Sequence, residues 1–276
     1  MQHCPNIGIG IGISLRSTSA FSGLLNLYPG AAAAYSLRRF GPYGGPVVEV
    51  RRSSDSTTDT FTANQITGGD LVAFCGAGDG FVPTWYDQSG SANNATQGTT
   101  TSQPKIVSAG ALVVGGLDFD GRHLETSLVP QNVMTYIAVA DPLTFSNGLI
   151  VGARDSTNQR SYMGQGASFN STIGVGSQNN LFGSINDWMD DSIAFGTYDG
   201  SNVNMYINGA NTISSAQTVD PNNTTRGIAI GAMNDAGTFT TIPWRGTGHE
   251  IIIYTSDQSA NRAGIETNIN DFYSIF

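Results

Sequence analysis

Aromatic residues with acidic or amide neighbours are the side chains of this sequence best suited to hold a ligand. Protein sites that recognise sugars stack the ring on an aromatic face and hold its hydroxyl groups with carboxylate or amide groups. The sequence contains three tryptophans. Trp85 and Trp188 have acidic or amide residues close by, and Trp244 stands nearer the end of the chain. We therefore expect the candidate carbohydrate-binding residues to be Trp188, Asp187, Trp244, Trp85, Asp87 and Gln88.

A structural role is the alternative for the group around Trp85. Trp85 and Tyr86 follow Phe81 and Val82, so they could belong to a core strand. Asp87 and Gln88 would then hold the next loop through hydrogen bonds from side chain to backbone. For Trp188, which lies in the polar segment 186–191, both roles are open.

Other kinds of chemistry lack the spacing they need. The acidic group Asp187, Asp190 and Asp191 could hold Ca²⁺, whose ligands are oxygens, but no calcium-loop pattern surrounds it. We expect no cofactor and no metal site. The three histidines have no metal or triad spacing, and His249 is expected to be a structural histidine. The glycine-rich residues 76–80 are not followed by the lysine of a phosphate loop, and no Gly-x-Ser-x-Gly pattern occurs.

Composition excludes further classes of function. Twelve basic residues stand against 21 acidic ones, giving a net charge of −9, and Lys105 is the only lysine. Nucleic-acid binding needs a basic face, so it is not expected. No stretch is apolar enough to insert into a membrane, and residues 1–14 do not resemble a signal peptide. We expect the chain to be made in a cytoplasm without a cleaved leader.

Residues 1–30 differ from the rest of the chain and are interpreted as an assembly or attachment arm. Ile7, Ile9, Ile11 and Ile13 alternate with glycine, so an extended segment would present every isoleucine on one face. Such a strand would pair with a second chain or another partner. A disordered leader is the alternative. Cys4 lies in this arm, far from Cys75 in the sequence, and two free thiols are favoured over a disulfide.

Residues 31–276 show the pattern of one large β domain. Short apolar or alternating runs are separated by turn residues at regular spacing. In the clearest of them Val203, Met205 and Ile207 alternate with polar residues before Asn208-Gly209, a pair typical of a type I′ hairpin turn. Near the end, Ile265, Ile269, Phe272 and Phe276 recur at helical spacing after a capping residue among 255–257.

Two ordered sets of short segments carry a family resemblance. In the first half these are YSLRR at 35–39, VEVRRSSD at 48–55, WYDQSG at 85–90 and NNATQ at 93–97. They resemble the start of the fungal α-L-arabinofuranosidase B catalytic domain, and, with QPKIV at 103–107 and LDFDG at 117–121, modules of phage and marine bacterial proteins. In the second half, GTYDG at 196–200, VNMYING at 203–209 and EIIIY at 250–254 resemble laminin-G and concanavalin A-like jelly rolls. Together they imply an all-β, concanavalin A-like two-sheet jelly-roll sandwich with a short C-terminal helix.

The resemblance also allows the catalytic residues of the arabinofuranosidases to be sought. Their nucleophile is a Glu after a central strand, whereas the matching segment 152–156 contains Arg154 and Asp155 and no Glu. Their acid is an Asp, and Met233 stands in its place unless a gap brings in Asp235. Their vicinal cysteine pair is absent. From these differences we expect no catalytic residues and a protein that is not an enzyme.

Three functions follow as expectations. The first is a non-enzymatic structural virion protein, a phage fibre, spike or capsid-decoration subunit located in the virion. It would contact other virion proteins, form a homo-oligomer and display a lectin-like domain to surface glycans. The second is an extracellular or surface carbohydrate-binding module, and the third an arabinofuranosidase-like glycoside hydrolase.

Overall fold

The computed structural model describes residues 23–276 except 145, 157–158, 177–180, 218–224 and 240. The isoleucines of the predicted arm and Cys4 lie outside the described residues, so the arm stays a prediction. Residues 23–30, placed in the arm by the sequence pattern, contain the short helix α1 (Leu24–Leu27), which contacts the C-terminal helix α4 (Arg262–Tyr273). Leu24 is buried, and the Tyr254 hydroxyl donates to the carbonyl of Tyr28.

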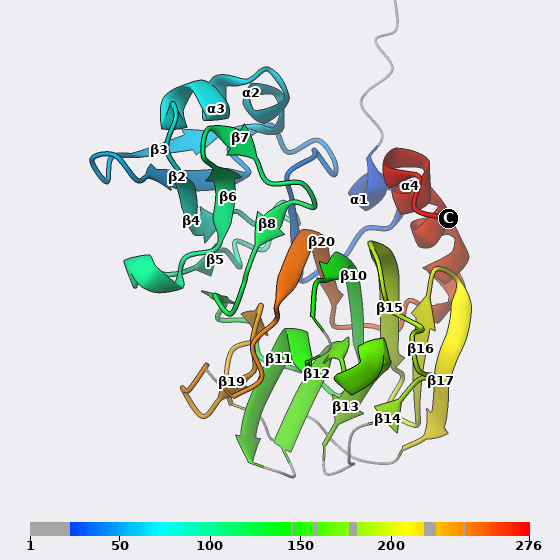
Figure 1. Ribbon diagram of the computed structural model, residues 1–276. Helices are drawn as coiled ribbons and strands as arrows, with labels where there is room; N and C mark the ends of the chain where they lie inside the picture. Colours follow the sequence, from blue (N-terminus) through cyan, green and yellow to red (C-terminus); the bar gives the residue numbers. More distant parts are fainter. Residues whose placement is uncertain (1–22, 145, 157–158, 177–180, 218–224, 240) are drawn as a thin grey trace, which may run out of the picture.

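The chain forms the expected all-β fold, in which antiparallel strands lie in two layers (Figure 1). Each strand of the first layer is hydrogen-bonded to the next in the order β1, β20, β10, β15, β16, β17. Their bounds are β1 (Ala33–Ser36), β20 (Gly246–Tyr254), β10 (Met134–Pro142), β15 (Ser192–Tyr198), β16 (Asn202–Ile207) and β17 (Ala210–Ala216).

The second layer runs from β14 through β13, β12, β11, β18, β9, β5, β4 and β2 to β3. The short strand β8 pairs with both β6 and β20 and so joins the layers, while β19 runs parallel to β11. The bounds are β2 (Val48–Arg52), β3 (Thr58–Phe61), β4 (Gly80–Trp85), β5 (Ala95–Thr96), β6 (Lys105–Ser108), β7 (Ala111–Leu112), β8 (Leu117–Asp118), β9 (Leu124–Glu125), β11 (Gly148–Ser156), β12 (Gln159–Gln165), β13 (Ser171–Val175), β14 (Leu181–Phe182), β18 (Ala229–Ile230) and β19 (Asn234–Asp235).

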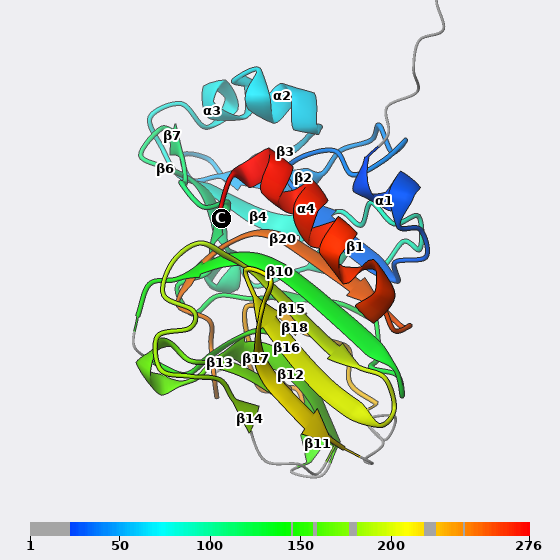
Figure 2. The same ribbon diagram turned by 90° about the vertical axis from the view of Figure 1, so that its right-hand side faces the viewer.

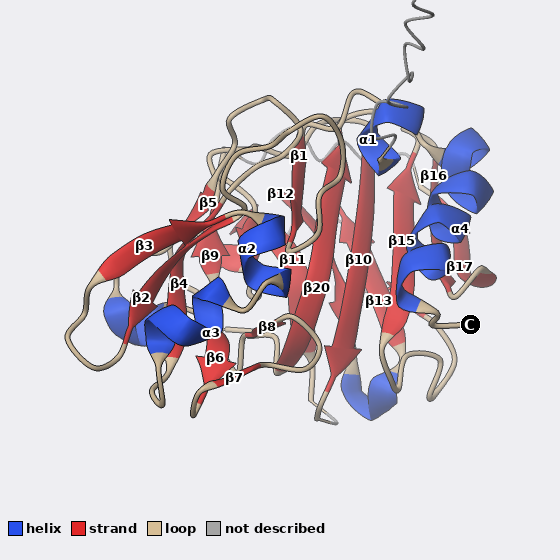
Figure 3. Cartoon of the chain, turned by 90° about the horizontal axis from the view of Figure 1, so that it is seen from above, coloured by secondary structure: helices blue, strands red, loops and turns tan. Residues whose placement is uncertain are grey.

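Strands β1, β20, β10 and β15 of the first layer are buried on both faces, which explains their continuous apolar runs, whereas β16 and β17 are partly exposed on one face. Side chains alternate between the two faces of a strand. On β10, Tyr136 and Ala138 belong to the core between the layers, whereas Ile137 and Val139 belong to a second core under the helices. Figures 2 and 3 show α4 and α1 over the outer side of this layer.

The predicted C-terminal helix is present, but its start and its buried face differ in detail. It begins at Arg262 after a 3₁₀ turn, and the residue before it makes no side-chain cap. The Asp257 carboxylate accepts from the backbone N–H of Ser259, so it closes the preceding turn and does not cap the helix. Ile265 and Ile269 are buried, while Phe272 and Phe276, predicted to share their face, are each 57% exposed.

The hairpin between β16 and β17 is formed as the sequence predicts. Asn208 and Gly209 both have positive φ, 50° and 79°, as a type I′ turn requires. Val203, Met205 and Ile207 point into the core, each at most 4% exposed. Two further short helices, α2 (Ala63–Thr67) and α3 (Asp70–Cys75), cover the other end of the second layer, and α3 ends at the buried Cys75.

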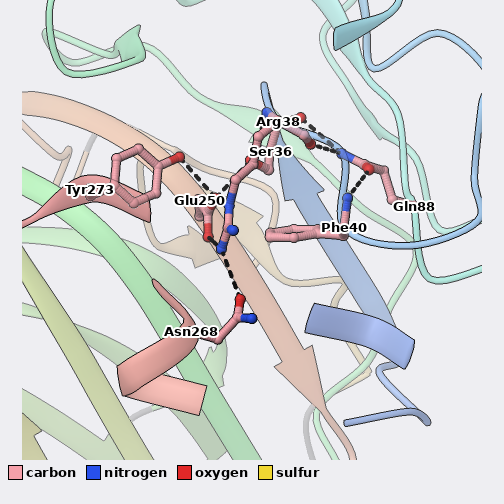
Figure 4. A network of polar contacts seen from close by, with 7 residues as sticks. All are labelled: Ser36, Arg38, Phe40, Gln88, Glu250, Asn268 and Tyr273. Atoms are coloured by element: carbon pink, nitrogen blue, oxygen red, sulfur yellow. Dashed lines mark hydrogen bonds and ion pairs between the residues drawn. The ribbon is translucent and has the colours of Figure 1, made fainter. Parts of the chain in front are cut away.

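A buried ion pair joins the centre of the first layer to its surroundings (Figure 4). The Glu250 carboxylate on β20 receives hydrogen bonds from the Ser36 and Tyr273 hydroxyls at 2.9 and 2.8 Å. It also binds the guanidinium group of Arg38 through both carboxylate oxygens. Burial opposes the charge on Arg38, but Glu250 outweighs that effect and raises the pKa of Arg38. The network therefore ties β1, β20 and α4 together.

Removing the Ile269 side chain should loosen the contact between α4 and the sheet. Ile269→Ala leaves a cavity under the helix, and we expect the free energy of unfolding to fall by about 2–5 kcal/mol. The matched control is Phe276→Ala, which removes a mostly exposed side chain and should change stability by about 0.5 kcal/mol or less. Urea denaturation of both variants measures the difference. Equal stabilities would show that α4 is not held by this packing.

Neutralising the buried Glu250 should lower the free energy of unfolding more than neutralising a glutamate that is only partly buried. Glu250→Gln leaves the Arg38 charge without its partner, and we expect a loss of about 3–5 kcal/mol. Glu49→Gln is the control because Glu49 is bonded to the Thr84 hydroxyl and touches no cation in the ion pairs of the described residues. A loss of stability no larger than that of the control would contradict a central role for the pair.

Candidate functional site

A cavity of about 120 Å³ opens on the second layer, beside β11, β12, β13 and β14. Its floor contains Leu149 and Met233, which pack against Tyr162 in a small cluster of their own. A cavity of about 150 Å³ holds a benzene ring. The cavity is somewhat smaller, so part of one ring of a ligand could enter, with the remainder outside the cavity.

The wall of the cavity combines aromatic rings with neutral polar groups. Phe182 on β14 is 48% exposed, so one part of its ring faces solvent at the cavity. Tyr162 on β12 is almost fully buried, and Gln165 and Thr172 bring an amide and a hydroxyl group to the same wall. This is the composition of a site that stacks a ring and binds hydroxyl groups.

Two glycines give the aromatic rings their places. A Cβ atom on Gly174 of β13 would lie 2.2 Å from Tyr162 Cζ, and one on Gly166 would lie 2.6 Å from Phe182 Cε1. Any larger residue at these positions would displace the rings. The positions of the Tyr162 and Phe182 rings thus depend on glycine, which has no side chain, at positions 174 and 166.

The phenol of Tyr162 is neutral at physiological pH. Burial raises its pKa to about 12, against the smaller lowering effects of the nearby Arg160 and Arg154 charges and of the hydrogen bond with Thr172. A neutral phenol can both donate and accept a hydrogen bond. Tyr162 is therefore suited to bind a ligand hydroxyl and unsuited to act as an acid or a base.

An ion pair lies at the edge of the cavity. Arg154, which lines it, binds the Asp235 carboxylate through two nitrogens, with Nε at 2.8 Å from Oδ1. The pairing of β11 with β19 sets Arg154 opposite Asp235. The hydrogen bond from Arg154 is the main cause that lowers the pKa of Asp235. Asp235 consequently stays ionised over a wide pH range.

The adjacent Asp155 is engaged elsewhere. Burial alone would raise the pKa of Asp155, but hydrogen bonds from Thr225 and Arg226 lower it overall. Its Oδ1 accepts from Arg226 Nε at 3.0 Å, and its Oδ2 accepts from the Thr225 hydroxyl at 3.1 Å. Asp155 is not among the residues that line the cavity. Asp155, in the segment that lacks the nucleophilic Glu, and Asp235, which a gap would bring to the place of the acid, are therefore held by separate arginines.

A glycosidase of the usual kind needs two carboxyl groups, one of them with a raised pKa so that it can donate a proton. Among the described residues that line the cavity, none is acidic. Asp235 lies next to it and has a lowered pKa. This part of the chain thus offers one ionised carboxylate near the cavity and lacks the pair of carboxyl groups within its described lining.

The tryptophans predicted from the sequence are in the core. Trp188 and Trp244 are fully buried and pack together at 5.3 Å between ring centroids. Their indole nitrogens donate to the carbonyls of Ala140 and Thr247. A fully buried indole has no face open to a sugar, so neither residue belongs to the cavity described above.

The segment around Trp85 has the structural role that was the alternative. Trp85 is fully buried and packs on Tyr35. Asp87 Oδ1 accepts from the backbone N–H groups of Ala34 and Ser89. Gln88 donates to the carbonyls of Ser36 and Arg38 and accepts from the N–H of Phe40. These side chains join the loop after β4 to the chain around β1, far in sequence.

The acidic group near Trp188 does not converge. The Asp187 carboxylate accepts from Ser171, and burial raises its pKa. Asp191 binds His249 Nε2 at 2.9 Å, which gives His249 the structural partner expected for it. In the residues that the structure describes, no group of three or more histidine, cysteine or acidic side chains could hold a metal ion. Nor is any helix there long and apolar enough to cross a membrane.

The sequence interpretation missed the aromatic residues of the cavity. Phe182 and Tyr162 have no acidic or tryptophan neighbour that draws attention to them. The only signal was indirect, because Arg154, Met233 and Asp235 belong to the segments that resemble the catalytic segments of the arabinofuranosidases. The structure places these three at the same cavity or its edge.

Comparison with known proteins gives structural neighbours only. No protein-family model matches the chain, and none of the curated proteins compared with it matches. An arabinofuranosidase complexed with arabinofuranosyl-α-1,2-xylobiose matches with a TM-score of 0.64 and 17% identity over 87% of this chain. A mutant GH54 α-L-arabinofuranosidase soaked with 4-nitrophenyl α-L-arabinofuranoside matches over the same share with a TM-score of 0.65, also at 17% identity. The chain spans 62% of the length of either protein.

These neighbours correct the expectation that the chain is not an enzyme. The solved structures with TM-scores of 0.63 to 0.65 are glycoside hydrolases. That expectation is therefore wrong: the missing Glu was given more weight than the shared architecture. At 16–17% identity the likeness shows the fold, so hydrolysis by this chain enters as a proposal. A Ruminococcus gnavus sialidase CBM40 bound to α2,3-sialyllactose also matches, at 10% identity over 50% of this chain and 84% of that one. Its TM-score is 0.44, too low to support a functional comparison. The phage and marine bacterial part of the resemblance finds no support.

The ion pair of Arg154 and Asp235 should be visible in the pH dependence of stability. Asp235 has a lowered pKa in the folded chain, so the pair stabilises the fold at neutral pH and loses this effect as Asp235 is protonated in acid. We expect the free energy of unfolding to fall less between about pH 5 and pH 2 in Asp235→Asn than in the wild type. Arg154→Met should have the same effect, because it removes the cause of the shift. Unchanged acid profiles in both variants would show that the pair does not form in solution.

Proposed function

We propose that this chain is a carbohydrate-active domain that binds a glycan by holding one sugar ring in the cavity beside β11 to β14. The observation that carries the proposal is the half-exposed ring of Phe182 at a cavity lined by Tyr162, Gln165 and Thr172. An exposed aromatic face next to neutral hydrogen-bonding groups fits the two sides of a sugar, one apolar and one rich in hydroxyls.

The fold supports the same proposal and suggests a first ligand. A structural neighbour is complexed with arabinofuranosyl-α-1,2-xylobiose, an oligosaccharide that carries one arabinofuranosyl ring. A cavity of about 120 Å³ accommodates such a terminal ring better than the inside of a linear chain. We therefore propose a branch-end sugar as the part that enters.

The test compares two exposed apolar side chains on one segment. Phe182→Ala should weaken binding of arabinofuranosyl-α-1,2-xylobiose about tenfold in isothermal titration calorimetry, equivalent to about 1.4 kcal/mol of lost stacking. Ile185→Ala should leave the affinity unchanged, because Ile185 is 72% exposed and does not line the cavity. Xylobiose, which lacks the arabinofuranosyl ring, is the control ligand. Equal affinities of the two variants would refute the site.

Hydrolysis is the second candidate function, favoured by Asp235 at the edge of the cavity and by the fold of the neighbours. An ionised Asp235 has the protonation state of a nucleophile or a base. Release of 4-nitrophenolate from 4-nitrophenyl α-L-arabinofuranoside, lost in Asp235→Asn, would support it. Turnover that survives this substitution would exclude Asp235 from the reaction. A virion role and assembly through residues 1–30 stay predictions.

A further inference from the structure

A second and larger cavity lies on the opposite side of the first layer from the core between the layers. It has a volume of about 520 Å³ and is formed by α2, β7, the chain after β1, β20 and α4. Figure 3 shows α2 and α4 on the same face of the sheet, with β20 and β10 between them. We call this cavity the α2–α4 cleft. It shares no lining residue with the cavity of Phe182.

One wall of the cleft is apolar. Leu112 on β7 and Phe272 on α4 contribute its exposed apolar side chains, whereas Ile66 on α2 and Ile106 on β6 are only 5% and 0% exposed. Leu112 is 39% exposed and Phe272 57% exposed, so part of this surface remains open to solvent. Pockets of about 300–1,000 Å³ with mainly apolar walls and few polar groups are typical of small-molecule sites.

The other wall is basic. Arg38 and Arg39 both line the cleft, together with His249, and no acidic side chain does so among the described residues. This is unusual in a chain with a net charge of −9. Arg38 is fixed from behind by Glu250 (Figure 4). Its guanidinium carbon lies 4.6 Å from the centroid of the Phe272 ring. Its guanidinium group is thus held rigidly, which lowers the entropy cost of binding an anion. Because Glu250 balances the charge of Arg38, the net positive charge of this wall comes from Arg39.

Asn268 supplies a neutral donor beside this charge. Its Oδ1 accepts from Arg38 Nη2 at 3.5 Å, which orients the amide (Figure 4). Its Nδ2 makes no hydrogen bond with the described residues. A cation and an amide N–H₂ group side by side match the two oxygens of a carboxylate.

We propose that the α2–α4 cleft binds a small amphipathic carboxylate, with its carboxylate at Arg38 and Asn268 and its apolar body on the exposed side chains of Leu112 and Phe272. The basic wall selects the charge, and the apolar wall selects a body of one or two rings or a short alkyl chain. This site is independent of the glycan site, so the outcome of one test does not decide the other.

The probe is 3-phenylpropanoate, with 3-phenylpropanamide as its neutral isostere, titrated into the full-length protein by calorimetry. We expect the carboxylate to bind at least tenfold more tightly than the amide. Asn268→Ala should reduce that preference several-fold. Equal binding of the two probes would overturn the assignment of the basic wall.

A matched pair of substitutions on one loop tests the location. Leu112→Glu sets a negative charge in the wall and should weaken 3-phenylpropanoate binding at least tenfold. Val114→Glu adds the same charge two residues away, at a position 93% exposed and outside the wall, and should change affinity less than twofold. Equal effects of the two variants would overturn the site.

Failure of the full-length protein to bind either probe would also overturn the proposal. Gly23, the first described residue, lies in its wall, so residues 1–22 or a second copy of the chain would be the occupants to test next. Urea midpoints of all variants must match the wild type, and a variant that unfolds is replaced by Leu112→Asp and Val114→Asp.

Discussion

The burial of the Glu250 carboxylate is the constraint on which the arrangement of the first layer depends. An uncompensated buried charge costs several kcal/mol, so the elements around β20 must deliver partners to it. Ser36 comes from β1, Arg38 from the chain after β1, and Tyr273 from α4. Residues 36–38 and the C-terminal helix are therefore fixed against one central strand. The same interaction holds Arg38 against the ring of Phe272 and gives the α2–α4 cleft its basic wall.

The second layer solves a different problem, since it must leave a cavity in a closely packed sheet. A strand side chain normally fills the space above its neighbour. Opposite Tyr162 stands Gly174, and the ring lies across the backbone there. The ring of a neighbouring residue occupies the space that a side chain would fill there, and the cavity results from this arrangement. The short strand β14 lies at the edge of the sheet, which leaves Phe182 half exposed. Recognition and packing consequently depend on the same glycines.

Much of the fold could be predicted from sequence because its signals are local. The alternation at Val203, Met205 and Ile207 and the Asn208-Gly209 turn specify one hairpin, and Ile265 and Ile269 specify a helix with one buried face. The site could not be predicted in this way. Trp188 sits in a polar segment yet is buried on Trp244, 56 positions later, and Phe182 reaches the cavity through pairings of β13 with its neighbours. Such contacts depend on strand order, which no local pattern reports.

Because Asp235 is paired with Arg154, binding a sugar in the cavity and hydrolysing it would make different demands on the side chains. The proposed recognition would use Phe182, Tyr162 and the neutral polar groups of the cavity wall. Hydrolysis also needs a carboxylate free to approach the sugar, whereas Asp235 is bound by two nitrogens of Arg154. A pair of this kind is among the stronger polar contacts in proteins. Catalysis with Asp235 would therefore require the incoming sugar to draw Arg154 away, so the binding energy at Phe182 and Tyr162 would have to supply the separation.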